Sequence, residues 1–196
     1  MRKAERTKQT ILEHAAPLFN QKGIAGTTID DVLQAAKVTK GCLYSHFENK
    51  DDLSAQTADF MLAKLAGSLQ AVMSRATSAK GCILAYLDYS KDPLDTVLAG
   101  GCPVTNLAVE ADDNNPVVKQ KVGAMLLASK AMFTSILQDG IAQGEFAPTL
   151  KAEEFAFKMF AAVEGATVIC RVLGSSQPMH QLVKSLKDEL ESHALR

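Results

Sequence analysis

The chain has 196 residues, of which 47% are hydrophobic and 22% charged, a composition that suits one or two soluble domains with a sizeable core. Its net charge of −1 at pH 7 argues against a protein that binds polyanions over its whole surface. The charge is uneven, however: residues 1–50 carry eight Lys/Arg and five Asp/Glu, whereas residues 51–196 carry 13 and 17. Only the N-terminal part is therefore expected to meet an anion.

The first 47 residues are predicted to hold three helices. Residues 3–22 show the apolar spacing of an amphipathic helix, which Gly23 is expected to end. A second helix follows from a cap in the Thr-Thr pair to Ala36, with acidic residues in its first turn, where the helix dipole favours them. After a short link, Thr39 can cap a third helix that runs to about Phe47.

Further helices are expected along the rest of the chain. Their predicted positions are 50–73, 78–92, a short segment after Gly100-Gly101, 116–143, 152–173 and about 179–194. No segment shows convincing strand alternation, an internal repeat or low complexity. The chain is therefore predicted to be all-α, with nine or ten helices.

The tight link between the second and third helices is typical of a helix-turn-helix, whose second helix enters the major groove of DNA. Its N-terminal turn is Thr39, Lys40, Gly41 and Cys42. Gly41 lets the backbone approach DNA closely, Lys40 can reach phosphate or guanine, and Cys42 can touch a base edge or a thymine methyl group. This turn is the predicted base-reading segment.

Phosphate contacts are expected beside that turn. Tyr44 and His46 lie on the helix face away from Leu43 and Phe47, where polar-tipped rings can reach the DNA backbone. Lys50 begins the next helix and, with the backbone N–H groups there, could hold another phosphate. Tyr44 or His46 alone would be an ordinary surface or core residue, so the interpretation depends on the combined pattern.

The stretch TTIDDVLQAAKVTKGCLYSHFENKDDL resembles the DNA-binding signature of the TetR (tetracycline-repressor) family of transcriptional regulators, and AAPLFNQKG resembles the end of its first helix. Cys42 departs from the serine, threonine or alanine expected there. The resemblance covers about the first quarter of the chain. The matching positions, which add Thr28 to the expected DNA contacts, are Thr28, Ile29, Ala35, Ala36, Val38, Lys40, Gly41, Leu43, Tyr44, His46, Phe47, Lys50 and Leu53.

The resemblance implies a DNA-binding domain at residues 1–49, with its motif at about 28–47, and a regulatory domain for ligand binding and dimerisation at 50–196. It also implies a repressor that binds double-stranded operator DNA as a homodimer and leaves it when a small-molecule or reactive inducer binds. The inducer pocket is expected to lie among residues of the middle helices: Phe60, Met61, Leu87, Met125, Phe133, Phe160 and Glu164.

The predicted helix at 152–173 is apolar on nearly all sides. Such a helix either forms the core of its own domain or also packs on a partner subunit. The resemblance implies the second arrangement, a four-helix bundle about a two-fold axis, with Val163 and Ile169 at the dimer interface.

Cys102 is the best candidate for a reactive thiol. Gly100-Gly101 is expected to end one helix and Pro103 to begin the next, which places Cys102 at the cap. The positive end of a helix dipole favours a thiolate, and in some TetR-like regulators with a similar Gly-Cys-x-x-x-Asn segment a cysteine is thought to sense reactive compounds. The alternative is a small buried residue beside a tight turn, with Asn106 bonding the loop.

Other classes of protein find little support in the sequence. It shows no Ser/His/Asp order, phosphate-binding glycine loop, C-x-x-C pair or zinc-ligand spacing, so no enzyme, cofactor or metal site is expected. The N-terminus lacks a signal-peptide core and the longest C-terminal apolar run is too short for a bilayer, so we expect a cytoplasmic protein without a membrane partner. A helical small-ligand-binding or adaptor protein is the alternative, but it leaves the segment from Thr39 to Lys50 unexplained.

Overall fold

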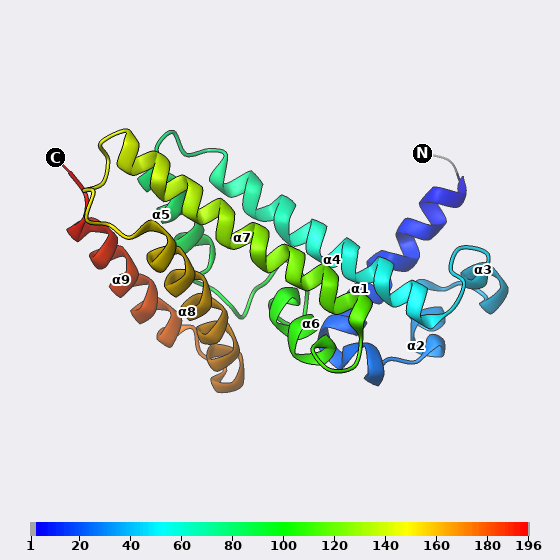
Figure 1. Ribbon diagram of the computed structural model, residues 1–196. Helices are drawn as coiled ribbons and strands as arrows, with labels where there is room; N and C mark the ends of the chain where they lie inside the picture. The colour runs from blue at the N-terminus through cyan, green and yellow to red at the C-terminus, as the bar shows by residue number, and fades with distance from the viewer. Residues whose placement is uncertain (1–2, 196) are drawn as a thin grey trace. The chain divides into compact units, whose positions relative to one another are not determined.

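The computed structural model describes residues 3–195, which form helices α1 to α9 and the loops between them (Figure 1). Within these residues, the extended pairing is limited to one isolated bridge between Phe146 and Ala194. The all-α prediction is therefore confirmed. In chain order the helices are α1 (Lys3–Gly26), α2 (Ile29–Ala36), α3 (Lys40–Tyr44), α4 (Lys50–Met73), α5 (Ala79–Tyr89), α6 (Pro103–Ala111), α7 (Pro116–Ala142), α8 (Ala152–Leu173) and α9 (Gln177–Ser192).

Glycines and prolines lie at several of the helix ends. Gly23 interrupts α1 with φ of +79°, as predicted, and a further turn follows it. Gly174 closes α8 in the left-handed conformation, whereas Pro103 and Pro116 each begin a helix.

The expectation that Gly100-Gly101 ends a helix is wrong. Helix α5 already stops at Tyr89, shortly before Pro93, which cannot donate a helical hydrogen bond. Both glycines lie in the long loop that follows, with φ values of +112° and +102°. Residues other than glycine rarely adopt such φ angles, so the pair shapes this loop rather than terminating a helix.

The chain divides into two compact units, and the division falls inside α4 and α7. One unit contains the residues up to Leu65 together with Val97–Ala124. Here α2 and α6 both contact α1, and the interior contains fully buried side chains such as Ile11 and Leu43. The segment that carries α6 thus belongs to the same unit as α1, α2 and α3.

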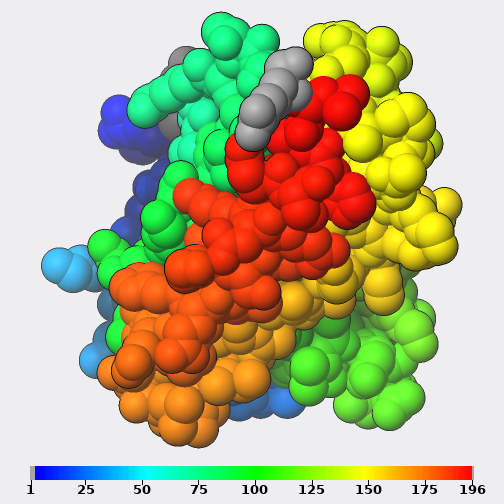
Figure 2. Space-filling model, turned by 90° about the vertical axis from the view of Figure 1, so that its left-hand side faces the viewer, coloured from blue at the N-terminus to red at the C-terminus, as the bar shows by residue number. Residues whose placement is uncertain are grey.

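The other unit contains Ala66–Thr96 and the residues from Met125 onward. In it α9 lies along α8 (Figure 2), and α9 buries Met179, Val183, Leu186 and Leu190, which recur every three or four residues. The ring of Phe133 lies in the core of this unit, with its centroid 4.4 Å from that of Tyr86.

Glu145, in the loop after α7, joins three parts of this second unit. Its carboxylate accepts hydrogen bonds from the backbone N–H groups of Ala79 and Lys80, at 2.9 Å each, and so caps the start of α5. Its backbone carbonyl accepts a hydrogen bond from Leu195, just beyond α9. None of the helices in the described part of the chain has the length and apolar character that a membrane crossing requires.

Candidate nucleic-acid interface

Helix α2 begins at a reciprocal cap. The Oγ1 atom of Thr28 accepts from the N–H of Asp31 at 3.1 Å, and the N–H of Thr28 donates to Oδ2 of Asp31 at 2.8 Å. The hydrogen bonds from Thr28, first from its backbone and then from its hydroxyl, lower the pKa of Asp31, as does the nearby Lys22. The carboxylate form of Asp31 thus fixes the backbone at Thr28.

A three-residue turn links α2 to α3. Lys37 ends α2 in the left-handed conformation, with φ of 54°, and its N–H donates to the carbonyl of Leu33. Two residues later, Oγ1 of Thr39 accepts from the N–H of Cys42 at 3.2 Å and caps α3. The predicted helix-turn-helix is therefore present, although α3 ends at Tyr44 rather than near Phe47.

The two faces of α3 and of the turn after it differ as predicted. Leu43 and Phe47 are buried, whereas Lys40, Gly41 and Tyr44 are exposed. A Cβ atom built on Gly41 would have no heavy atom within 4 Å, so its backbone lies on open surface. Thr39 is exposed as well, whereas the remaining predicted contacts in this region are half-buried: Cys42, His46 and Lys50.

Two residues that the sequence pattern did not single out support this surface. Lys8 of α1 places its ammonium 5.5 Å from the ring centroid of Phe47. Asp52 of α4 accepts from the N–H of Glu48 at 3.0 Å, and hydrogen bonds from Gln56 and then from that N–H lower the pKa of Asp52. These contacts fix the segment in which Lys50 begins α4.

Cys102 occupies the N-cap of α6, with Pro103 in the first position of the helix, as predicted. The thiol is half-buried. Asn106 does bond the loop, since its Nδ2 atom lies 3.0 Å from the carbonyl oxygen of Gly100. The same Nδ2 atom also lies 3.0 Å from the carbonyl oxygen and from Oδ1 of Asn20 on α1, a buried residue that sequence reasoning missed.

The residues expected around an inducer are divided between the two units. Phe60 and Met61 belong to the first, and the other five to the second. Met61, Leu87 and Phe133 are fully buried, whereas Phe60, Met125, Phe160 and Glu164 are half-buried. The ring centroids of Phe133 and Phe160 lie 6.2 Å apart, as in an ordinary aromatic core contact.

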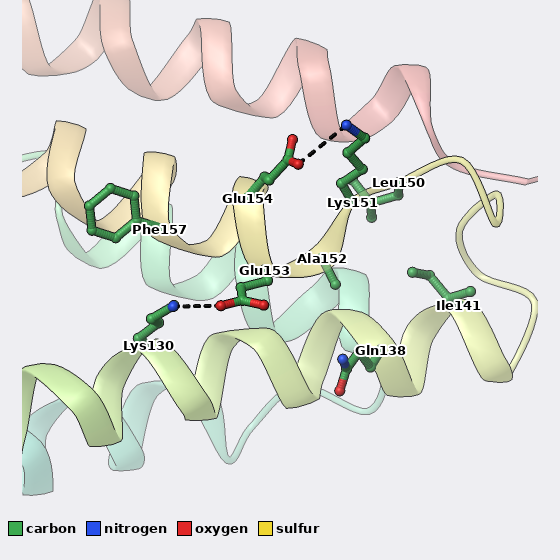
Figure 3. A pocket seen from close by; sticks show the side chains of 9 residues that line it. All are labelled: Lys130, Gln138, Ile141, Leu150, Lys151, Ala152, Glu153, Glu154 and Phe157. Atoms are coloured by element: carbon green, nitrogen blue, oxygen red, sulfur yellow. Dashed lines mark hydrogen bonds and ion pairs between the residues drawn. The ribbon is translucent and has the colours of Figure 1, made fainter.

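A separate hollow of about 510 Å³ opens on the second unit (Figure 3). Two ion pairs border it, Lys130–Glu153 at 2.6 Å and Lys151–Glu154 at 3.2 Å. None of the seven predicted pocket residues lines it. Its lining comes from α7 (Lys130, Gln138, Ile141), the loop before α8 (Leu150, Lys151) and α8 (Ala152, Glu153, Glu154, Phe157).

The two residues predicted at a dimer interface have different surroundings. Ile169 is 53% exposed, whereas Val163 is 4% exposed and lies in the hydrophobic core of its own unit. Val163 thus presents no side chain to a partner. Because α8 is apolar on nearly all sides, periodicity alone could not separate its inner face from its outer face. Within residues 3–195 we find no group of three His, Cys, Asp or Glu side chains that could hold a metal ion.

Two family models match the chain. Residues 11–57 match the bacterial regulatory proteins of the tetR family, and residues 80–186 match the tetracyclin repressor-like C-terminal domain. The first match covers the capped α2, the turn and α3, and the second covers more than half of the chain.

Solved structures and curated relatives agree with these models. A TetR-family regulator from Cytophaga hutchinsonii is 32% identical, with a TM-score of 0.93, over 100% of this chain and 98% of that one. A TetR regulator from Chloroflexus aurantiacus is 31% identical, with a TM-score of 0.94, over 99% and 98%. The transcriptional regulator TtgR of Pseudomonas putida is 29% identical over 83% of this chain and 79% of its own. The protein therefore belongs to the TetR family of DNA-binding transcriptional regulators, which are not enzymes.

Proposed function

We propose that this regulator is a homodimeric repressor that binds a two-fold operator and leaves it when a small-molecule or reactive inducer binds. The observation that carries the proposal is the joint presence of an exposed reading turn and a long, exposed apolar face on α8. A single reading helix contacts only a few bases, whereas the two helix-turn-helix motifs of one dimer read two half-sites about 34–36 Å apart. No catalytic role is proposed, and the protein acts in the cytoplasm, where bacterial DNA lies.

The face of α8 that suits a second copy of the chain is well defined. Ile169, Val172 and Leu173 are 53, 81 and 64% exposed, and Phe157 is 60% exposed at the other end of the helix. Gly165 lies between them, with open space where a Cβ atom would be, so a partner helix can approach closely. We call this face, together with Val168 and with Leu127 of α7, the apolar band. Pairing α7 and α8 with their copies would cover the band in a four-helix bundle.

On DNA, the turn from Thr39 to Cys42 would enter the major groove. Lys40 and Cys42 would face base edges, and Gly41 would allow the backbone to approach them. Tyr44, His46 and Lys50 would contact phosphates on one side of the groove. Thr28 would contact the phosphate backbone at the start of α2, where helix N–H groups favour anions.

The reactive inducer is proposed to act on the unit that contains the helix-turn-helix. Cys102 is half-buried beside Gly101, whose carbonyl oxygen accepts a hydrogen bond from the buried Asn20 of α1. A group added to the thiol would crowd this contact, which supports a reactive inducer. A reversible ligand in the second unit, beside Leu87, Met125, Phe133, Phe160 and Glu164, is the second candidate, favoured by the aromatic and Met side chains among them.

One experiment tests both parts of the proposal. Operator sequences are selected from a random duplex pool with wild type and with Cys42→Ser, because an alkylated Cys42 in the reading turn would block DNA binding by itself. Affinity is then measured with and without N-ethylmaleimide for Cys42→Ser and for the double variant Cys42→Ser/Cys102→Ser. We expect a two-fold symmetric operator, released on alkylation of Cys42→Ser but not of the double variant. Equal release from both variants would exclude Cys102 as the sensor. Failure to bind duplex DNA at any salt concentration would instead favour the ligand-carrier or adaptor alternative.

A further inference from the structure

We propose that Glu110 of α6 is a positioning residue for DNA recognition, which sets the backbone at the start of α2 and thereby the place of Thr28. The inference rests on the proposed contact between Thr28 and DNA. It concerns a carboxylate that lies outside the helix-turn-helix in sequence but within the same compact unit.

The carboxylate of Glu110 binds the corner between α1 and α2, which is the last turn of α1 after Gly23. Its Oε2 atom accepts from the N–H of Ile24 at 2.8 Å, and its Oε1 atom accepts from the N–H of Ala25 at 2.7 Å. Gly23 makes these two N–H groups available, because its φ of +79° and ψ of 163° interrupt the helix there. Glu110 thus caps the last turn of α1 from a separate helix.

Gly23 also packs closely against the carboxylate of Glu110. A Cβ atom built on Gly23 would lie 3.1 Å from both carboxylate oxygens of Glu110. Gly23 is therefore suited to this corner both by its backbone angle and by the space that the carboxylate occupies.

A short connection, in which Thr27 is buried, runs from this corner to Thr28. Thr27 is fully buried, and its Oγ1 atom donates to the carbonyl oxygen of Gly23 at 2.7 Å. Its backbone N–H donates to the carbonyl oxygen of Ile24. The next residue is Thr28, the N-cap of α2. Any displacement of the Ile24–Ala25 turn is therefore passed to Thr28 through the hydrogen bonds of Thr27.

A second contact fixes the same two helices one turn earlier. Asn20, 4% exposed, donates from Nδ2 to the carbonyl oxygens of Ala99 and Gly101, both at 3.0 Å. Asn106, four residues before Glu110 and so on the same face of α6, contacts Asn20 in turn. Glu110 therefore acts on a helix pair whose register is already set by Asn20, and its own effect is local to the corner.

The role of the carboxylate can be tested because an amide in its place cannot accept both hydrogen bonds. A glutamine at this position has one oxygen acceptor and an NH₂ group, so one of the two backbone N–H groups would face a donor. The charge that strengthens both hydrogen bonds would also be lost. Glu110→Asp keeps the charge but shortens the side chain by one methylene, so it can no longer reach both N–H groups in the same geometry.

The experiment measures operator affinity of the full-length protein by fluorescence anisotropy at a temperature and urea concentration where each variant is folded. We expect Glu110→Gln to weaken binding on the order of tenfold, and Glu110→Asp to act in the same direction. Amide hydrogen exchange should rise in the segment 23–28 and stay unchanged in α7. Asp113→Asn, in the exposed turn after α6, removes the same charge and should leave affinity unchanged.

A double-mutant cycle with Thr28→Ala separates positioning from general stability. If Glu110 acts through Thr28, the double variant binds no more weakly than Thr28→Ala alone. Additive losses would overturn the proposal, as would a Glu110→Gln protein that unfolds at lower urea but binds the operator like wild type. If wild type itself bound no operator, the proposed DNA contacts would fail. Wild-type binding together with an unaffected Glu110→Gln variant refutes only the role of Glu110.

Discussion

Thr28 and Asp31 hold each other at the start of α2. The N–H and the hydroxyl of Thr28 both donate to Oδ2 of Asp31, at 2.8 and 2.7 Å, while the N–H of Asp31 donates back to Oγ1 of Thr28. A residue expected to meet DNA is thus held by a carboxylate whose ionised form accepts these bonds more strongly than the neutral acid would.

This arrangement predicts a defined loss of stability in acid. The pKa of Asp31 in the folded protein lies below its ordinary value of 3.8, mainly because of the hydrogen bonds from Thr28. A carboxylate with a lowered folded pKa contributes stability above the unfolded pKa and loses it as pH falls through the folded one. Asp31→Asn should therefore be less stable than wild type at pH 7, and the difference should shrink below about pH 4.

Urea unfolding at pH 7 and at pH 3 measures this effect. Asp30→Asn is the matched control, because it removes the same charge from the same turn but lies outside the capping box. A difference between wild type and Asp31→Asn that persisted unchanged at pH 3 would contradict the assignment.

Lys37→Gly is expected to stabilise the protein. Among the described non-glycine residues, Lys37 alone has positive φ, at 54°. Relief of that strain outweighs the greater freedom of glycine in the unfolded chain, for a net gain of about 0.5–1 kcal/mol. Gln34→Gly, on the exposed face of α2, should instead cost about 1 kcal/mol. The two urea midpoints should therefore move in opposite directions, and a parallel fall would contradict the strain argument.

Gly41→Ala should separate stability from DNA binding. The Cβ atom meets no heavy atom within 4 Å, so alanine should stabilise the free protein by about 0.5–1 kcal/mol. On DNA the added methyl group would stand between the backbone and the bases, and we expect affinity to fall on the order of tenfold. Gly67→Ala, on α4 and equally open, is the control that should gain stability without losing affinity. Unchanged operator affinity in Gly41→Ala would exclude close backbone approach.

The two types of DNA contact should respond differently to substitution. Lys50→Ala and Tyr44→Phe are expected to weaken binding to all duplexes alike, and Lys50→Ala should also reduce the salt slope by about one. Lys40→Ala and Cys42→Ala should instead change sequence preference in a selection from random DNA. Lys64→Ala, on the exposed face of α4, serves as the charge control. If Lys50→Ala kept full affinity, the proposed docking would be wrong.

Most helices and caps could be predicted from local patterns, whereas the contacts between distant segments could not. The spacing of apolar residues, the Thr27-Thr28 pair and Thr39 indicated α2, the turn and α3, because capping and amphipathicity depend on neighbouring residues. The hydrogen bonds of Glu110 to Ile24 and Ala25 cross about 85 residues, and no local pattern indicates them. Asn20 could have been noticed as a polar residue beside Phe19 on a largely apolar helix face.

Ile169→Lys is expected to produce monomers. The substitution places an ammonium in the apolar band, where dimerisation would bury it without a partner. Sedimentation velocity should show a dimer for wild type and a folded monomer for the variant, with an unchanged helical circular dichroism spectrum. Val163→Lys is the informative contrast, because Val163 lies in the core of its unit and its replacement should unfold the chain. A monomeric wild type would refute the dimer.

The contact between Gly100 and Asn20 also determines when the unit that contains the helix-turn-helix can be completed during synthesis. A Cβ atom on Gly100 would lie 2.6 Å from the carbonyl oxygen of Asn20, so these two segments of the chain touch directly. Asn20 leaves the ribosome about 80 residues before the carbonyl groups that satisfy its buried amide. A nascent chain that ends near Leu65 therefore contains all three helices of the reading motif, yet its Asn20 amide and its Ile24 N–H still lack their final acceptors.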